Sequence, residues 1–168
     1  MYNLLIVGAG QLGSRHLQGL SKLIGDNSIY IVDPSDESLH IAEIRLSEVK
    51  ERNLNNKYFY KKYYDDLPKK IDLAVIATNS DVRKDVLDNL IRVVNIDNLL
   101  LEKFLFQKES EFFETADLLN KQNINTWVNC TRRMYPEFTE LKNNLLNKKI
   151  KEINVIGTNW ALGSNAIH

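Results

Sequence analysis

Short apolar runs alternate along the chain with segments in which apolar residues recur every three or four positions. This alternation is typical of βαβ units, in which a helix follows each strand and crosses over to the next parallel strand. The runs carry few polar residues, which indicates strands buried on both faces. We predict strands at residues 4–7, 29–32, 58–60, 72–77, 99–101 and 125–129. The pattern therefore predicts an α/β fold with a doubly wound parallel sheet.

Helices are predicted between and after these runs. The first begins near Gln11 and ends at Gly25, and Asp36 is placed to cap the second. The last begins at Pro136, because proline is favoured in the first turn of a helix. The residues expected to face the core are Leu12, His16, Leu20 and Leu23; Leu39, Ala42, Leu46 and Val49; Val82, Val86, Leu90 and Val93; Phe112, Ala116 and Leu119; and Phe138, Leu141 and Leu145.

The last apolar positions follow a different pattern. Ile153 and Val155 alternate with the polar residues Glu152 and Asn154. Such alternation predicts a strand with one face in solvent, unlike the strands before it. We expect this strand to open a second, truncated α+β domain. The predicted organisation is a first domain at residues 1–130, followed at 131–168 by a crossover helix and the first strand of an incomplete second domain.

A glycine-rich turn joins the first predicted strand to the first helix. Its residues are Gly8, Ala9, Gly10, Gln11, Leu12 and Gly13. The first glycine permits the tight turn, the second lets the backbone approach a pyrophosphate, and the third allows close packing of helix on strand. The helix N-terminus directs N–H groups and a positive dipole end at phosphates. The turn predicts a Rossmann-type dinucleotide-binding domain at residues 1–130; a purely structural βα turn is the alternative.

Asp33 ends the second predicted strand, twenty residues after Gly13. A carboxylate at this place accepts hydrogen bonds from the adenosine ribose hydroxyls of a dinucleotide. Residues 34–38 contain no Arg or Lys to hold a 2′-phosphate, and their carboxylates would repel one. We therefore expect NAD to be preferred over NADP. The alternative is that Asp33 serves only as a turn or capping residue.

Polar residues follow the later strands, where the crevice of an open α/β sheet lies. Thr78, Asn79 and Ser80 follow the fourth strand, Glu102 and Lys103 the fifth, and Asn129, Arg132 and Arg133 the sixth. A lysine at a strand end is often a solvated charge. Beside a positively charged nicotinamide ring, however, the neutral amine of Lys103 is favoured, which suits it to proton transfer.

Composition narrows the range of partners and sites. The chain has 22 Lys and Arg against 22 Asp and Glu, so no overall field favours nucleic acid or an anionic membrane. The start carries no basic and apolar leader, and no run reaches membrane-spanning length, so we expect a soluble, cytoplasmic protein. Cys130 is the single cysteine, which excludes an internal disulfide, and no His/Cys spacing predicts a metal site.

In order, the segments GAGQLGSRH, VD, VIATNS, LLLEKF and NCTRRMYP resemble the N-terminal half of the Gfo/Idh/MocA family, which includes glucose-fructose oxidoreductase and inositol dehydrogenase. The resemblance implies an NAD-dependent dehydrogenase acting on a hydroxyl of a sugar, sugar nucleotide or cyclitol. It also implies that a His trails the glycine loop, here His16, and that Lys103 of the Glu-Lys-Pro motif is catalytic. Association into a homo-oligomer through the second domain is a further implication.

Two positions depart from the family's pattern. Phe104 stands where the motif has proline, and Ser164 stands where the second domain has an Asp four residues before a catalytic His. The resemblance places that catalytic His at His168. The imidazole at this position is normally oriented or charge-balanced by the missing carboxylate.

Two other functions stay open. The chain is alternatively a non-catalytic NAD-binding or nucleotide-sensing module, and we expect residues 1–168 alone to be inactive because the substrate site would lack its far wall. A reductase of an unsaturated substrate on the same fold needs no proton-abstracting His, and so tolerates Ser164 better.

Overall fold

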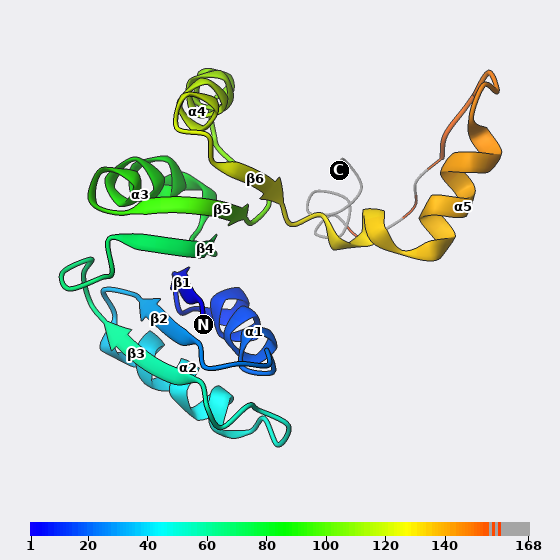
Figure 1. The fold of residues 1–168 in the computed structure, drawn as a ribbon. Helices are drawn as coiled ribbons and strands as arrows, with labels where there is room; N and C mark the ends of the chain where they lie inside the picture. Colours follow the sequence, from blue (N-terminus) through cyan, green and yellow to red (C-terminus); the bar gives the residue numbers. More distant parts are fainter. Residues whose placement is uncertain (155, 157, 159–168) are drawn as a thin grey trace. The chain divides into compact units, whose positions relative to one another are not determined.

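The computed structural model describes residues 1–154, 156 and 158, and it divides the chain into two compact units, residues 1–128 and 129–168. The first unit contains β1 (Asn3–Val7), α1 (Gln11–Leu20), β2 (Ser28–Val32), α2 (Asp36–Ser47), β3 (Lys57–Lys61), β4 (Lys70–Ile76), α3 (Ser80–Val93), β5 (Asn95–Leu101), α4 (Glu109–Lys121) and β6 (Asn125–Val128). The second contains the short 3₁₀ helix η1 (Thr131–Met134) and α5 (Pro136–Leu145) (Figure 1).

The six strands form one parallel sheet in the order β3-β2-β1-β4-β5-β6. The chain winds outward from β1 to β3, returns to the centre at β4, and then winds to the other edge (Figure 1). The order therefore reverses between β1 and β4, which is the switch point where ligands of such sheets bind. This topology confirms the predicted doubly wound Rossmann fold.

Side chains of β1 alternate between two cores, one on each face of the sheet. Leu4 and Ile6 pack in a cluster that includes residues of α1 and α2, whereas Leu5 and Val7 pack in a cluster that includes residues of α3 and α4. All four are buried, as expected for successive residues of a central strand that point to opposite faces. Burial on both faces fixes the register of β1, and with it the position of the turn that follows.

The inward face of α1 differs from the predicted one. Gly13, Ser14 and Leu17 are buried, whereas Leu12 is 50% exposed and Leu23 lies beyond the helix in an exposed position. The cause is Gly13, which packs against the glycine turn and thereby sets the rotation of the helix. The helix also ends at Leu20 and not at Gly25, although Gly25 has the positive φ of 110° that suits glycine.

Three smaller corrections concern α2, α3 and α4. Ser35, not Asp36, caps α2, because its side chain accepts a hydrogen bond from the backbone N–H of Ser38. The face of α3 is rotated by one position, so that Val82 and Val93 are exposed while the buried residues are Arg83, Leu87 and Leu90. In α4 the buried residues are Thr115 and Leu119, whereas Phe112 and Ala116, which were predicted to face the core, are exposed. The core residues predicted for α2 are confirmed at Leu39, Ala42 and Leu46.

The second unit begins α5 at Pro136 as predicted. Phe138, Leu141 and Leu145 share one side of the helix by their spacing, but they are exposed and not an inner face, because burial needs a packing partner that the described part of this unit does not supply. Residues 151–154 are in no strand, and Val155 lies outside the described residues, so the predicted strand there stays a prediction. No helix within the described part of the chain is long and apolar enough to cross a membrane.

Candidate functional site

The glycine turn lies between β1 and α1, at the carboxyl edge of the sheet. A Cβ atom at Gly13 would lie 1.7 Å from the carbonyl oxygen of Gly8, so only glycine lets the helix pack this closely. Gly8 has a φ of 93°, in the left-handed region that other residues rarely adopt. At Gly10 an added Cβ would meet no atom within 4 Å, which shows that its backbone faces open space. The three glycines therefore have the separate properties that the motif predicts.

The N-terminus of α1 is suited to an anion. Gly10 is the N-cap residue and offers no side chain to the first turn of the helix, which also contains no acidic residue. The first N–H groups of an α-helix have no acceptor within the helix, and the dipole adds partial positive charge at this end. Gln11 and Leu12 are exposed beside it. The turn and the helix together fit a pyrophosphate group.

Asp33 holds the glycine turn and the segment that follows β2. Its Oδ2 accepts a hydrogen bond of 2.7 Å from the backbone N–H of Ala9, and its Oδ1 accepts one of 2.9 Å from the N–H of Ser35. Ala9 is buried, so its amide serves Asp33 and not a ligand. Each carboxylate oxygen has two lone pairs, so capacity for ribose hydroxyls remains. The two interpretations of Asp33, ribose ligand and turn residue, are compatible in this geometry.

Lys62 approaches the same end of the sheet and was missed by the sequence analysis. Its Nζ lies 2.6 Å from Oδ2 of Asp36, and this hydrogen bond raises the pKa of Lys62 above its ordinary value. Lys62 follows β3, which pairs with β2, so the strand order brings it close to the start of α2. Lys62 lies far from the second strand in the sequence, so no local pattern marks it as a cation that could lie near a 2′-phosphate.

A cavity of about 450 Å³ joins the glycine turn to the ends of β4 and β5. The predicted site residues that line it are Gly10, Gln11, Leu12, Thr78, Asn79, Ser80 and Lys103. The buried Oγ1 of Thr78 has no hydrogen-bond partner among the residues that the structure describes. A ligand in this cavity would touch both the helix N-terminus and the segment that carries Lys103. The structure therefore brings most of the predicted residues to one place.

Glu102 connects the end of β5 to α1. Its side chain is 3% exposed, and its Oε1 lies 2.7 Å from Nε2 of His16. The sequence analysis singled out both residues but did not predict this contact, because they are 86 positions apart. The pair places the segment after β5 against the helix of the glycine turn.

Arg83 of α3 is a buried cation that contacts the same segment. The apolar periodicity of the helix did not include Arg83 in the predicted core face. Its side chain is 2% exposed and donates hydrogen bonds to backbone carbonyls after β4 and β5. Burial lowers the pKa of Arg83, while the charges of Glu102 and Asp81 act in the opposite direction. Beside it, the peptide bond between Lys103 and Phe104 is cis.

The remaining predicted residues lie in the second unit or outside the described residues. Asn129, Arg132 and Arg133 lie in the second unit, where both arginines are exposed. Cys130 is half-buried in that unit. Ser164 and His168 lie outside the described residues. Among the residues that are described, no group of three or more His, Cys, Asp or Glu side chains is arranged to hold a metal ion.

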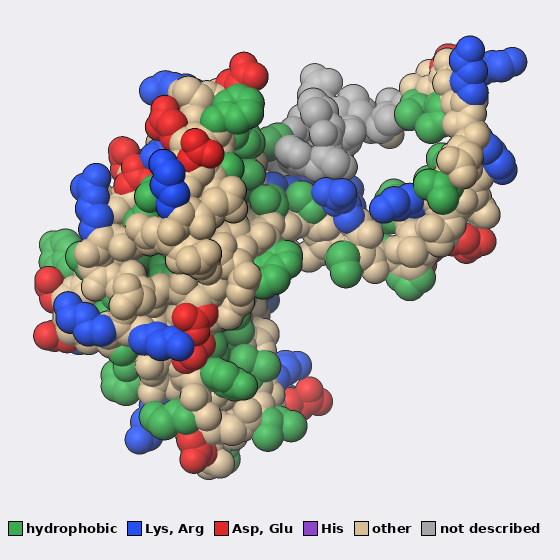
Figure 2. Space-filling model, turned by 45° about the horizontal axis from the view of Figure 1, so that its top comes forward, with side chains coloured by type: hydrophobic (Ala, Val, Ile, Leu, Met, Phe, Trp, Pro, Cys, Tyr) green, Lys and Arg blue, Asp and Glu red, His purple; other side chains and the backbone are tan. Residues whose placement is uncertain are grey.

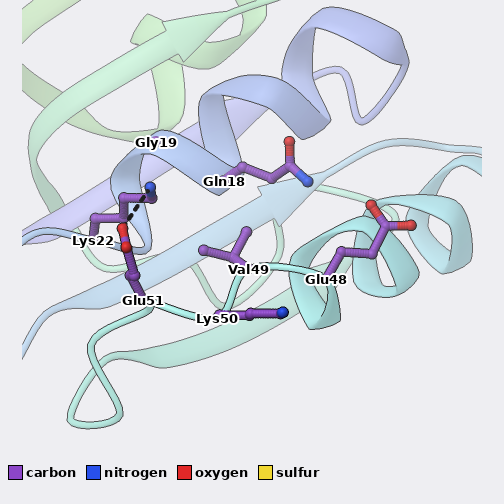
Figure 3. A pocket seen from close by; sticks show the side chains of 7 residues that line it. All are labelled: Gln18, Gly19, Lys22, Glu48, Val49, Lys50 and Glu51. Carbon is purple, nitrogen blue, oxygen red and sulfur yellow. Dashed lines mark hydrogen bonds and ion pairs between the residues drawn. The ribbon is translucent and has the colours of Figure 1, made fainter.

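A second hollow, of about 500 Å³, lies away from the strand ends, beside the end of α1 and the segment after α2 (Figure 3). Two of the residues that line it, Lys22 and Glu51, form an ion pair of 3.3 Å (Figure 3). It contains none of the predicted site residues. Figure 2 shows Lys and Arg side chains interspersed with Asp and Glu over the visible face, in keeping with the balanced composition.

Comparison with known proteins identifies a family for most of the chain. The model of the Gfo/Idh/MocA oxidoreductase family, described as an NAD-binding Rossmann fold, matches residues 2–130. No curated protein matches the sequence.

Three solved structures illustrate the similarity of fold. A myo-inositol 2-dehydrogenase from Lactobacillus plantarum is 19% identical with a TM-score of 0.66, over 90% of this chain and 43% of that one. The WlbA dehydrogenase from Thermus thermophilus, solved with NAD and alpha-ketoglutarate, is 18% identical with a TM-score of 0.66, over 89% and 48%. The UDP-N-acetylglucosamine 3-dehydrogenase GnnA from Acidithiobacillus ferrooxidans is 17% identical with a TM-score of 0.63, over 85% and 41%. The present chain thus spans less than half the length of each.

Proposed function

Because the chain belongs to the Gfo/Idh/MocA family of oxidoreductases, we propose that it forms the cofactor-binding half of an NAD-dependent dehydrogenase that acts on a hydroxyl of a sugar, sugar nucleotide or cyclitol. The observation that carries the proposal is the shared cavity, which is lined both by the glycine turn and by Lys103. Cofactor binding and proton transfer therefore have a common location on this chain.

The glycine turn holds the pyrophosphate of the cofactor in this proposal. The bare backbone at Gly10 permits close approach, and the first N–H groups of α1 donate hydrogen bonds to the phosphate oxygens. Thr78, Asn79 and Ser80 form the wall next to the nicotinamide, where the unpartnered Oγ1 of Thr78 gains a polar neighbour.

NAD is preferred over NADP in this site. Asp33 is oriented by two backbone N–H groups and directs its remaining lone pairs to the ribose hydroxyls. A 2′-phosphate at that place would meet the charges of Asp33 and Asp36, and Lys62, which follows the neighbouring strand, is already paired with Asp36. The preference for NAD thus rests on repulsion between the 2′-phosphate and the two carboxylates, and on the pairing of Lys62 with Asp36.

Lys103 is the proposed general base. When bound, NAD supplies the acceptor for hydride at the C4 atom of its nicotinamide ring. The neutral amine of Lys103 takes the proton of the substrate hydroxyl, which is required because hydride leaves readily only as the alkoxide forms. His168 is proposed to assist in the same proton transfer. The backbone segment from Glu102 to Phe104 fixes the direction from which the amine approaches.

Substitution of Lys103 by Met tests the role of the amine. Lys103→Met removes the base at nearly constant volume, so turnover of sugar or cyclitol substrates by the natural gene product should fall by about 10²-fold or more, the size of a general-base contribution. The affinity for NAD, measured by calorimetry, should remain nearly unchanged. Lys50→Met, at an exposed position after α2, is the matched control. Unchanged turnover in Lys103→Met would remove this residue from the mechanism, whereas NAD binding without turnover in the unaltered protein would favour the non-catalytic module.

A further inference from the structure

Arg83 is one of the largest fully buried side chains of the protein. Full burial of an arginine is uncommon and requires acceptors for its donors. Its Nη2 donates to the carbonyl oxygen of Thr78, and its Nη1 donates to those of Glu102 (2.5 Å), Phe104 and Leu105 (3.1 Å). Among the described residues, all the acceptors are backbone carbonyls, so the guanidinium holds the backbone in place and does not bind another side chain.

The acceptors come from the two strand ends that form the cavity wall. Thr78 follows β4, whereas Glu102, Phe104 and Leu105 follow β5. The carbonyls of Glu102 and Phe104 flank Lys103 on either side, so the residue proposed as base lies between two points held by the same guanidinium. A planar, rigid fork of donors fixes such a segment more tightly than a single point charge does.

A second restraint acts on the same segment from the opposite side. The Glu102 side chain contacts His16 of α1, while its backbone carbonyl accepts from Arg83 of α3. These two helices belong to different faces of the sheet, since residues of α1 and α3 pack in separate hydrophobic clusters. The segment that carries Lys103 is thus tied to both layers of the domain.

We propose that Arg83 is a positioning residue for Lys103: by holding the carbonyls on both sides of it, Arg83 keeps the amine directed into the cavity shared with the glycine turn. This inference rests on the proposed function for the role of Lys103. Arg83 also lines this cavity, but its guanidinium hydrogen-bonds backbone carbonyls, and the proposal gives it no contact with substrate or cofactor. Its contribution to turnover is therefore expected through the orientation of the base and not through cofactor affinity.

Nuclear magnetic resonance of the 168-residue chain tests this inference without an activity assay. Lysine labelled with ¹³C at Cε reports the side chain of Lys103, assigned by its loss in Lys103→Arg, and ¹⁵N labelling reports the backbone amides of Lys103 and Leu105. The variants are Arg83→Met, Arg83→Lys, and Arg92→Met as the matched control, because Arg92 lies exposed on the same helix. NAD affinity is measured in parallel by calorimetry.

In Arg83→Met, the change of the Lys103 Cε resonance on NAD addition should fall by at least about half, while the dissociation constant for NAD stays within about threefold. Arg92→Met should behave as the unaltered chain. Should Arg83→Met fail to fold, Arg83→Lys decides, since it retains the charge and some donors. It should fold and show shifted amide resonances of Lys103 and Leu105.

The inference is overturned if a folded Arg83 variant keeps both the amide resonances of Lys103 and Leu105 and the NAD response of the Cε resonance. A purely structural role also overturns it; in that case the two Arg83 variants lose stability while the Lys103 signals are unchanged. Failure of the proposed function is recognised separately, because then the unaltered chain does not bind NAD. In that case the amide resonances of the cofactor-free chain still decide the positioning role.

Discussion

The Nε2 atom of His16 lies 2.7 Å from the Oε1 atom of Glu102, so the helix of the glycine turn is joined directly to the end of β5. Glu102 is buried, so removal of His16 would take a hydrogen-bond partner away from a buried carboxylate. The contact links the proposed phosphate-binding turn to the segment of Lys103. His16 and Glu102 are therefore expected to affect both the stability of the domain and the geometry of the cavity.

His16→Ala is expected to destabilise the domain by about 1–3 kcal/mol, the cost of removing one hydrogen-bond partner from a buried charged group. Urea denaturation followed by circular dichroism measures this change. His40→Ala at an exposed position of α2 is the control and should shift the free energy of unfolding by less than about 0.5 kcal/mol. Equal stability of the two variants would show that the contact with Glu102 contributes nothing.

Gly13→Ala should prevent the native packing of α1. Its Cβ would lie 1.7 Å from the carbonyl oxygen of Gly8, a backbone atom that cannot move without displacing the turn. We expect a loss of more than about 3 kcal/mol, at the severe end of single substitutions, and loss of NAD binding. Gly19→Ala in the same helix meets no atom within 4 Å and should instead stabilise by up to about 1 kcal/mol. Thermal unfolding of both variants distinguishes close packing from helix propensity; a mild effect at Gly13 would contradict the geometry.

Asp36→Ser should raise the affinity for NADP relative to NAD. The substitution removes a carboxylate and releases Lys62, whose pKa is raised by its hydrogen bond with Asp36. A freed ammonium near the ribose should change the ratio of the two dissociation constants by about three- to tenfold, as for one solvent-screened charge. Asp65→Ser, at an exposed position after β3, is the control. Calorimetric titration with both cofactors gives the ratio, and an unchanged ratio would separate Lys62 from cofactor choice.

The stability of the domain should fall at alkaline pH because of buried tyrosines. Burial raises the pKa of Tyr60 to about 12, and burial likewise raises that of Tyr64 to about 12. The neutral phenol is thus favoured in the folded state, and this contribution is complete below the unfolded pKa of about 10 and lost as the pH rises through about 12. Urea midpoints measured from pH 8 to 12 should be constant at first and then decrease above pH 10.

Tyr60→Phe identifies the origin of that decrease. The hydroxyl of Tyr60 is buried without a hydrogen-bond partner among the described residues, so its removal should cost little stability at neutral pH and reduce the alkaline loss. Tyr63→Phe, at an exposed position, should leave the alkaline profile as it is. A profile that is identical in all three proteins would assign the decrease to other groups.

Periodicity and spacing were sufficient to predict the fold of the first unit. Strands buried on both faces are marked by continuous apolar runs, and the glycine turn follows directly from the chemistry of close backbone approach. The faces of α1 and α3 were predicted only in part: Leu90 is buried as expected, but Gly13 and Arg83 occupy buried positions that an apolar pattern does not reveal. In both cases packing against a particular neighbour, and not hydrophobicity, decides which side of the helix is buried.

The contacts that shape the site were beyond prediction for a related reason. His16 with Glu102, Arg83 with the carbonyls after β5, and Lys62 with Asp36 each join residues that are 19 or more positions apart. Which strand ends become neighbours depends on the sheet order, and which side chain reaches across depends on the rotation of the helices. The sequence identified Asp33 and Lys103 as polar residues at strand ends, but the tethering of Asp33 to Ala9 required the three-dimensional turn.

Calorimetric titration of the 168-residue chain with NAD and with NADP tests most simply whether the glycine turn and Asp33 form a cofactor site. We predict saturable binding of one NAD per chain and a dissociation constant for NADP at least about tenfold higher, equivalent to roughly 1.4 kcal/mol of discrimination. The absence of NAD binding, or tighter binding of NADP, would contradict the assignment.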